Sequence, residues 1–123
     1  MIQDRATSEA NFERFIARSL EGAKVYGLQD RDGGWAVCPS REYDDTDVIV
    51  LWSDRAYAAR HIRAEWSAYH VSEIGLDEFI GAWLRGMHED GSLVGPNWDA
   101  NLCGLEVEAT EVAKRLTSDD DSA

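Results

Sequence analysis

The apolar run at 48–52 (VIVLW) constrains the fold of this 123-residue chain more than any other segment. It has the length of a strand, and no polar residue alternates with the apolar ones, so it predicts a strand that is buried on both faces. Such a strand lies inside a sheet and needs covering elements on either side. The rest of the chain must therefore supply neighbouring strands and the helices that cover them.

Two segments flanking this run have the period of amphipathic helices. In residues 7–22, Phe12 and Ile16 share one face, with Ser8 expected to cap the helix and Gly22 to end it. Residues 53–66 follow the run directly, and Ser53 or Asp54 is expected to cap them. The predicted buried face of this second helix consists of Ala56, Ala59, Ile62, Arg63 and Trp66.

Residues 76–91 carry the clearest helical period in the chain. Their apolar stripe consists of Leu76, Phe79, Ile80, Trp83, Leu84 and Met87. Gly91 is expected to end this helix, because glycine readily adopts the left-handed conformation that closes many helices. A last, shorter helix is expected over 110–116.

The remaining β-forming segments predict the other strands. Residues 24–28 (KVYGL) and 35–40 (WAVCPS) are separated by a stretch ending in Asp-Gly-Gly, which is a strong reversal signal, so they predict a hairpin. Further short strands are expected at 67–75, 92–95 and 105–109.

Together these elements predict a single α+β domain over residues 1–116, with a mainly antiparallel sheet of about five strands covered by amphipathic helices. A chain of this length buries roughly two-thirds of its unfolded surface, which suffices for one core. Residues 117–123 are expected to form an acidic disordered tail. The predicted core consists of Phe12, Ile16, Val50, Trp52, Ile62, Trp66, Phe79, Trp83, Leu84 and Val107.

The net charge of −12 limits the classes of partner. An acidic surface repels phosphate backbones and anionic membranes, so neither nucleic acid nor a membrane is expected to bind. The same charge suits a basic protein partner, although acidic residues also serve simply to keep a domain soluble. The start of the chain lacks a signal sequence and no apolar run approaches the roughly 18 residues that span a bilayer, so a cytoplasmic location is expected.

Two polar segments are candidate binding surfaces. In the loop 97–101 (NWDAN), Asn97, Trp98, Asp99 and Asn101 form either a self-bonded loop anchored by its tryptophan or a polar and aromatic surface for a partner. In the turn 52–55 (WSDR), Ser53 and Asp54 either cap a helix or contribute to the same surface, and Tyr43 is a third candidate contributor.

The chain contains residue types that are found in catalytic and metal sites, but not at the spacing that such sites require. Ser53, Asp54 and His61 include the members of a triad, but no nucleophile-elbow motif surrounds the serine. The loop from Asp99 lacks the terminal glutamate of an EF-hand, and Cys38 and Cys103 stand in no zinc or redox motif. No catalytic, metal-binding or cofactor-binding residue is therefore assigned, and no cofactor is expected.

The segments DTDVIVLWSDRAYA, FIGAWLRGM and VGPNWDANLCGLEVE together resemble the bacterial family known as domain of unknown function 2750. The resemblance extends from about Phe12 to Leu116. It implies a small cytoplasmic α+β bacterial protein, and it supplies no catalytic residues, because the family carries no established activity.

Two classes of function remain. The first is a non-enzymatic protein-binding module for a basic partner, of which an inhibitor or immunity-like protein is one concrete version. The second is a small-molecule-binding or enzymatic domain whose pocket lies at the NWDAN loop and the WSDR turn. The sequence also leaves the oligomeric state undecided between a monomer and a homo-oligomer, because an exposed aromatic side chain can contact a second copy of the chain as readily as a different protein.

Overall fold

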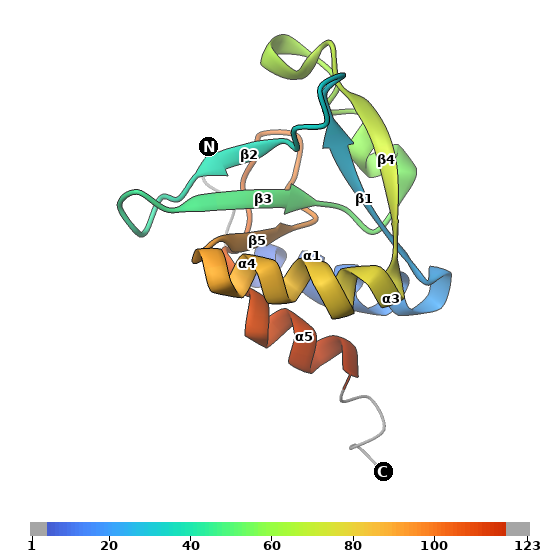
Figure 1. Cartoon of the computed structure of the whole chain (residues 1–123), viewed down its shortest axis with the longest axis vertical. Coiled ribbons are helices and arrows are strands. Elements are labelled where there is room, and N and C mark those ends of the chain that lie inside the picture. The colour runs from blue at the N-terminus through green and yellow to red at the C-terminus, as the bar shows by residue number, and fades with distance from the viewer. Residues whose placement is uncertain (1–4, 118–123) are drawn as a thin grey trace.

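The apolar run forms the strand β3 (Asp47–Leu51), which lies inside a four-stranded sheet, as predicted. The computed structural model describes residues 5–117 (Figure 1). Strand β3 pairs antiparallel with β2 (Val37–Pro39) and parallel with β5 (Leu93–Pro96). Strand β6 (Val107–Glu108) completes the order β2-β3-β5-β6 by pairing antiparallel with β5.

A second, two-stranded sheet consists of β1 (Lys24–Gln29) and β4 (His70–Gly75), paired antiparallel. The backbones of Tyr26 and Trp52 exchange two hydrogen bonds of 2.8 Å, and this bridge joins the two sheets. The predicted hairpin is present only next to its turn. The chain reverses at 30–34, and the bridge between Gln29 and Trp35 and a hydrogen bond of 2.9 Å from the Ala36 N–H to the Leu28 carbonyl follow. The main partner of β1 is β4, however, and that of β2 is β3.

Helix α1 (Arg5–Gly22) begins before the predicted cap. Ser8 lies buried inside the helix, so it does not cap it. The expected end at Gly22 is confirmed, and Ala23 takes the left-handed conformation (φ 60°) while its N–H donates to the Ser19 carbonyl.

The predicted helix over 53–66 is broken into α2 (Arg55–Ala59) and the short 3₁₀-helix η1 (Ala64–Trp66). Asp54 occupies the N-cap position, but neither it nor Ser53 makes a side-chain cap bond. The predicted face is right at Trp66, which is buried, but wrong at Ala56, Ala59 and Arg63, which are exposed. Ala58 and His61 are buried in their place. The contacts of His61 described below hold the chain in a turn at 60–63, and these tertiary contacts override helix propensity.

The helix predicted over 76–91 is confirmed, with one irregularity. It comprises α3 (Leu76–Glu78), the π-helical turn η2 (Phe79–Trp83) and α4 (Leu84–Asp90), and Gly91 ends it with φ 76°. The wider π turn lets Phe79 and Leu84, five residues apart, both face the core. The last helix, α5 (Ala109–Thr117), reaches Thr117, and the rest of the predicted tail lies outside the described residues.

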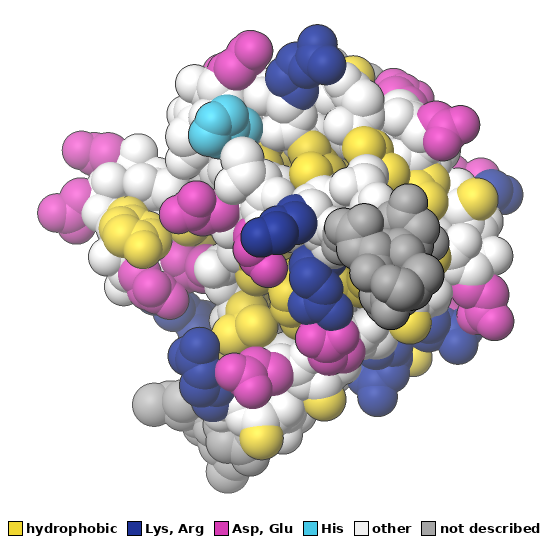
Figure 2. All heavy atoms as spheres, turned by 90° about the horizontal axis from the view of Figure 1, so that it is seen from below, with side chains coloured by type: hydrophobic (Ala, Val, Ile, Leu, Met, Phe, Trp, Pro, Cys, Tyr) yellow, Lys and Arg dark blue, Asp and Glu magenta, His cyan; other side chains and the backbone are white. Residues whose placement is uncertain are grey.

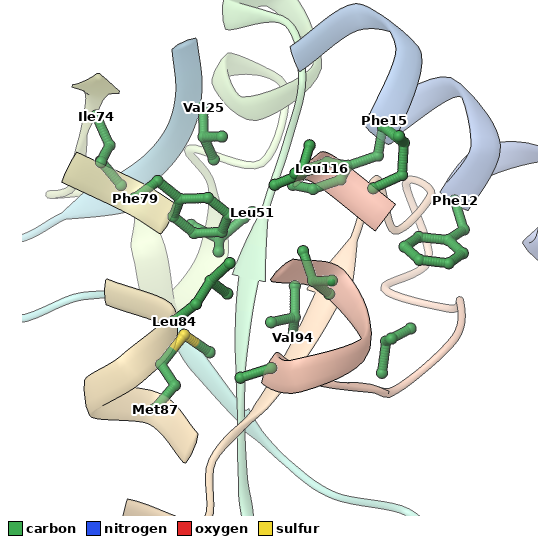
Figure 3. Packing of buried hydrophobic residues seen from close by; sticks show 14 residues of the cluster. Phe12, Phe15, Val25, Leu51, Ile74, Phe79, Leu84, Met87, Val94 and Leu116 are labelled. Atoms are coloured by element: carbon green, nitrogen blue, oxygen red, sulfur yellow. The ribbon is translucent and has the colours of Figure 1, made fainter. Parts of the chain in front are cut away.

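Two hydrophobic clusters cover opposite faces of the four-stranded sheet. Leu51 and Val94 pack against α1, α4 and α5, as Figure 3 shows for Phe15, Leu84 and Leu116. Val48 and Val50 face the second cluster, with α2, η1 and Trp98. The α+β class and the double-sided burial of β3 are therefore confirmed.

Most of the predicted core is buried. Ile62 and Trp83 are the exceptions, because both are only half-buried. Among the described residues, no helix has both the length and the apolar character needed to cross a membrane.

Candidate functional site

Asn97 joins the two candidate segments that the sequence singled out. Its backbone adopts φ 50°, and its side chain is 5% exposed. The Oδ1 atom accepts a hydrogen bond of 2.8 Å from the Ser53 N–H, and Nδ2 donates to Ser53 Oγ over 3.0 Å. The NWDAN loop and the WSDR turn thus meet, but they meet in the interior and satisfy each other.

Trp98 is a core residue. Its side chain is 2% exposed, and its indole N–H donates to the Leu105 carbonyl over 2.7 Å. Two glycines make room for the ring, since a Cβ atom at Gly104 would lie 2.3 Å from Trp98 Cδ1 and one at Gly95 would lie 2.8 Å from Cε2. The hypothesis of an exposed tryptophan at this loop is therefore wrong.

Asp99 organises the far end of the loop. Its Oδ1 accepts hydrogen bonds from the backbone N–H groups of Asn101 (2.9 Å) and Cys103 (3.1 Å), as a side chain does when it closes its own turn. Asp99 is half-buried and Asn101 is exposed. Of the four candidate residues in the loop, only Asn101 presents its side chain fully to solvent.

Three basic or ionisable side chains that the sequence did not assign to the loop also hold it. The buried His61 places Nδ1 3.0 Å from the Tyr57 carbonyl and Nε2 2.8 Å from the Asp99 carbonyl. Arg63 donates to the Ala100 carbonyl (2.6 Å), and Arg41 donates to the Leu102 carbonyl (3.1 Å). These residues lie far from the loop in sequence, so no local signal could have identified them.

Asp54 forms an ion pair with Arg18 of α1, and Ser53 donates a hydrogen bond to the same carboxylate. Ser53 Oγ lies 2.7 Å from Asp54 Oδ1, and Arg18 donates to both carboxylate oxygens, with Nη2 2.6 Å from Oδ2. The hydrogen bond from Arg18 lowers the pKa of Asp54 below its ordinary value. The carboxylate therefore stays ionised and tied to α1.

The polar side chains at this junction bond to one another and to α1. Asn97 bonds to Ser53, Ser53 to Asp54, and Asp54 to Arg18. Two hollows reach the loop, and neither is lined by Ser53 or Asp54. One, of about 310 Å³, is bounded by Trp98, Leu102, the segment 37–41 and η1, and a smaller one of about 90 Å³ lies between Ala100 and η1. The structure thus supports the self-bonded loop, not a pocket built from the NWDAN and WSDR segments.

Tyr43 lies apart, in the turn between β2 and β3. Its side chain is 56% exposed, the larger of the two values among exposed large hydrophobic residues of the described chain. Asp44, Asp45 and Asp47 lie beside it around an open hollow of about 460 Å³. Figure 2, in which this turn lies at the left, shows hydrophobic atoms there among acidic side chains.

A second acidic hollow adjoins the same turn. It has a volume of about 440 Å³, and glutamates from the turn, from β6 and its approach, and from α5 line it. They are Glu42, Glu106, Glu108 and Glu111, and Arg5 of α1 is the one basic residue that the structure describes in the same lining. Glu106 also fixes the start of the turn, since its carboxylate accepts hydrogen bonds from Ser40 Oγ (2.6 Å) and the Arg41 N–H (2.8 Å).

Within residues 5–117, no three His, Cys, Asp or Glu side chains are grouped so as to hold a metal ion. Cys38 and Cys103 are half-buried free thiols, and burial raises the pKa of Cys38.

Comparison with known proteins identifies the family. The family described as "Protein of unknown function (DUF2750)" matches residues 12–116. The chain belongs to the DUF2750 family. No curated protein and no solved structure matches it. The DUF2750 match spans the NWDAN loop, the WSDR turn and the Tyr43 turn, and it confirms the resemblance seen in the sequence.

Proposed function

We propose that this DUF2750 protein is a non-enzymatic protein-binding module, and that it binds a basic protein through the β2–β3 turn. The observation that carries the proposal is the exposed Tyr43 ring, which stands among Asp44, Asp45 and Asp47. An aromatic face attracts the ammonium and guanidinium groups of a partner, and the flanking carboxylates pair with them.

The position of the turn supports this proposal. It lies at the free end of the β2–β3 hairpin (Figure 1), so a partner reaches it without displacing any other element. Glu42 carries the acidic surface from the turn into the hollow formed with β6 and α5. The overall charge of −12 adds long-range attraction for a basic partner, which speeds association most at low salt.

The test begins with affinity purification from host-cell lysate at low salt, followed by titration of the recovered protein. We expect one basic protein to bind stoichiometrically and to dissociate as salt screens the charges. The triple variant Asp44→Asn, Asp45→Asn, Asp47→Asn and the single variant Tyr43→Ala should each weaken binding by about tenfold or more.

A matched control separates the turn from overall charge. The triple variant Asp77→Asn, Glu78→Gln, Glu89→Gln removes the same amount of charge from exposed positions of the helix over 76–90. It should retain binding. Equal loss in both triple variants, or the absence of any stoichiometric basic partner, would contradict the proposal.

A further inference from the structure

Among residues 5–117, strand β4 has a neighbouring strand on one edge only. The two-stranded sheet contains only β1 and β4, and β1 takes up one edge of β4 along its whole length, from His70 to Gly75. In Figure 1 no other strand lies on the far side of β4. A strand edge in this state offers a row of backbone donors and acceptors to another chain.

The hydrogen-bond pattern identifies the groups on that edge. Tyr26 and Leu28 bond toward the other sheet, to Trp52 and Ala36, so the residues between them bond toward β4. In an antiparallel pair the bonded positions alternate, which directs His70, Ser72 and Ile74 toward β1. Val71 and Glu73 therefore point their N–H and C=O groups outward, and no second strand within residues 5–117 pairs with them.

This edge lacks two of the usual protections against pairing, proline and a bulge. Monomeric proteins blunt an open edge with these features, with charged side chains or with a covering segment. The segment HVSEIG contains no proline or lysine, and its register with β1 is unbroken by a bulge. Glu73 is exposed and Val71 is only half-buried, so neither residue is enclosed by the fold.

The charges near the edge favour a neutral partner surface. The one carboxylate of the strand, on Glu73, is already paired with Lys24 (3.2 Å) and Arg55 (2.7 Å). No uncompensated acidic side chain on the strand remains to select a basic segment. Another strand with the same balanced charges meets no strong repulsion here, in spite of the net charge of the whole molecule.

We infer that β4 pairs antiparallel with β4 of a second copy of this chain, with Ser72 on the two-fold axis. In this register Val71 of each copy lies opposite Glu73 of the other, so the two-fold axis produces two equivalent pairs. Both residues have outward backbone groups, so each pair exchanges two hydrogen bonds. A register centred on Glu73 would instead put the two carboxylates directly opposite each other, which is destabilising. The inference does not depend on the proposed function.

The first test needs no variant. A strand pair is a small interface, so the full chain should form a weak, reversible dimer in sedimentation at high protein concentration and moderate salt. The amides of Val71 and Glu73 should then exchange more slowly as concentration rises, whereas the amide of Val37 on the outer edge of β2 should not change. A chain that stays monomeric to millimolar concentration would overturn the inference.

Two pairs of variants test the edge and the register. Val71→Pro removes an outward N–H and should weaken dimerisation about tenfold or more, while Val37→Pro, the matched change on β2, should not. Val71→Glu places a carboxylate opposite Glu73 and should also weaken the dimer, whereas Val71→Lys should preserve it.

Circular dichroism checks that each variant folds. If Val71→Pro fails to fold, the inference is tested by two other measurements. These are the comparison of Val71→Glu with Val71→Lys and the amide exchange of the unaltered chain. A dimer that survives both Val71→Pro and Val71→Glu uses another surface and refutes the inference, as does protection of Val71 and Glu73 only on addition of a different protein.

Discussion

Trp98 determines whether the NWDAN loop is a site or part of the core. Its ring is 2% exposed and its indole N–H is bonded, so Trp98→Ala leaves a large cavity and an unpaired carbonyl. We expect this change to lower the free energy of unfolding by about 3–5 kcal/mol, measured by urea denaturation.

Asn101→Ala is the control for that prediction. Asn101 is exposed in the same loop, and its substitution should change stability by no more than about 0.5 kcal/mol. If Trp98→Ala proved as stable as Asn101→Ala, the loop would not be part of the core.

The sequence does carry a signal for the burial of Trp98, in two nearby glycines. Gly95 and Gly104 flank the loop, and the structure shows that both positions must lack a side chain to accommodate the ring. A tryptophan between polar residues suggests an exposed surface, but small residues on either side of it suggest a ring that packs back onto its own loop. The sequence did indicate the role of Asp99, because an aspartate in a loop commonly bonds to the backbone of its own turn. The role of Asn97 could not be predicted in this way, since its side chain bonds to Ser53, which is distant in sequence.

At the scale of elements, the Arg18–Asp54 ion pair joins α1 to the start of α2. The lowered pKa of Asp54 means that the folded protein releases this proton more readily than the unfolded chain, whose value is near 3.8. The pair therefore stabilises the fold fully above that value, and its contribution is lost as pH falls through the lower folded value.

We expect Asp54→Asn to be less stable than the unaltered protein at neutral pH, and the difference should shrink as pH falls below about 3.8. Thermal unfolding across acidic pH measures this difference. Asp32→Asn, at an exposed position of the turn 30–34, should track the unaltered protein throughout. A difference for Asp54→Asn that persists unchanged at the lowest pH would show that the carboxylate charge is not the cause.

The elements that the sequence predicted well are those specified by their own periodicity. The run at 48–52 is buried on both faces, and the stripe on 76–91 faces the core. The failures involve the choice of partner. An Asp-Gly-Gly stretch indicates that the chain reverses but not which strands pair. Strand β1 pairs with β4 on one edge and bonds to Trp52 and Ala36 on the other, while β2 pairs with β3. The break after α2 likewise depends on His61 reaching Asp99, which is distant in sequence.

At the scale of the whole molecule, the net charge of −12 works against the folded state. Like charges are closer together in the compact chain than in the unfolded one, so screening them should stabilise the fold. Raising the salt concentration from low to physiological values should increase the free energy of unfolding by an amount on the order of 1 kcal/mol.

Urea denaturation at several salt concentrations measures this increase. The triple variant Asp44→Asn, Asp45→Asn, Asp47→Asn should respond less to salt, because it removes part of the repulsion. A stability that falls with added salt would mean that attractive ion pairs outweigh the repulsion between like charges.

The parallel pairing of β3 with β5 also governs the order of events in folding. The segment 52–92, with α2, β4 and the helix over 76–90, separates these two strands, whereas β2 and β3 are joined by a short turn. The β2–β3 hairpin can therefore form early, but β3 keeps an open apolar edge until the chain has closed this long loop. We expect loop closure to limit the rate of folding, and the unpaired edge of β3 to be where partly folded chains aggregate.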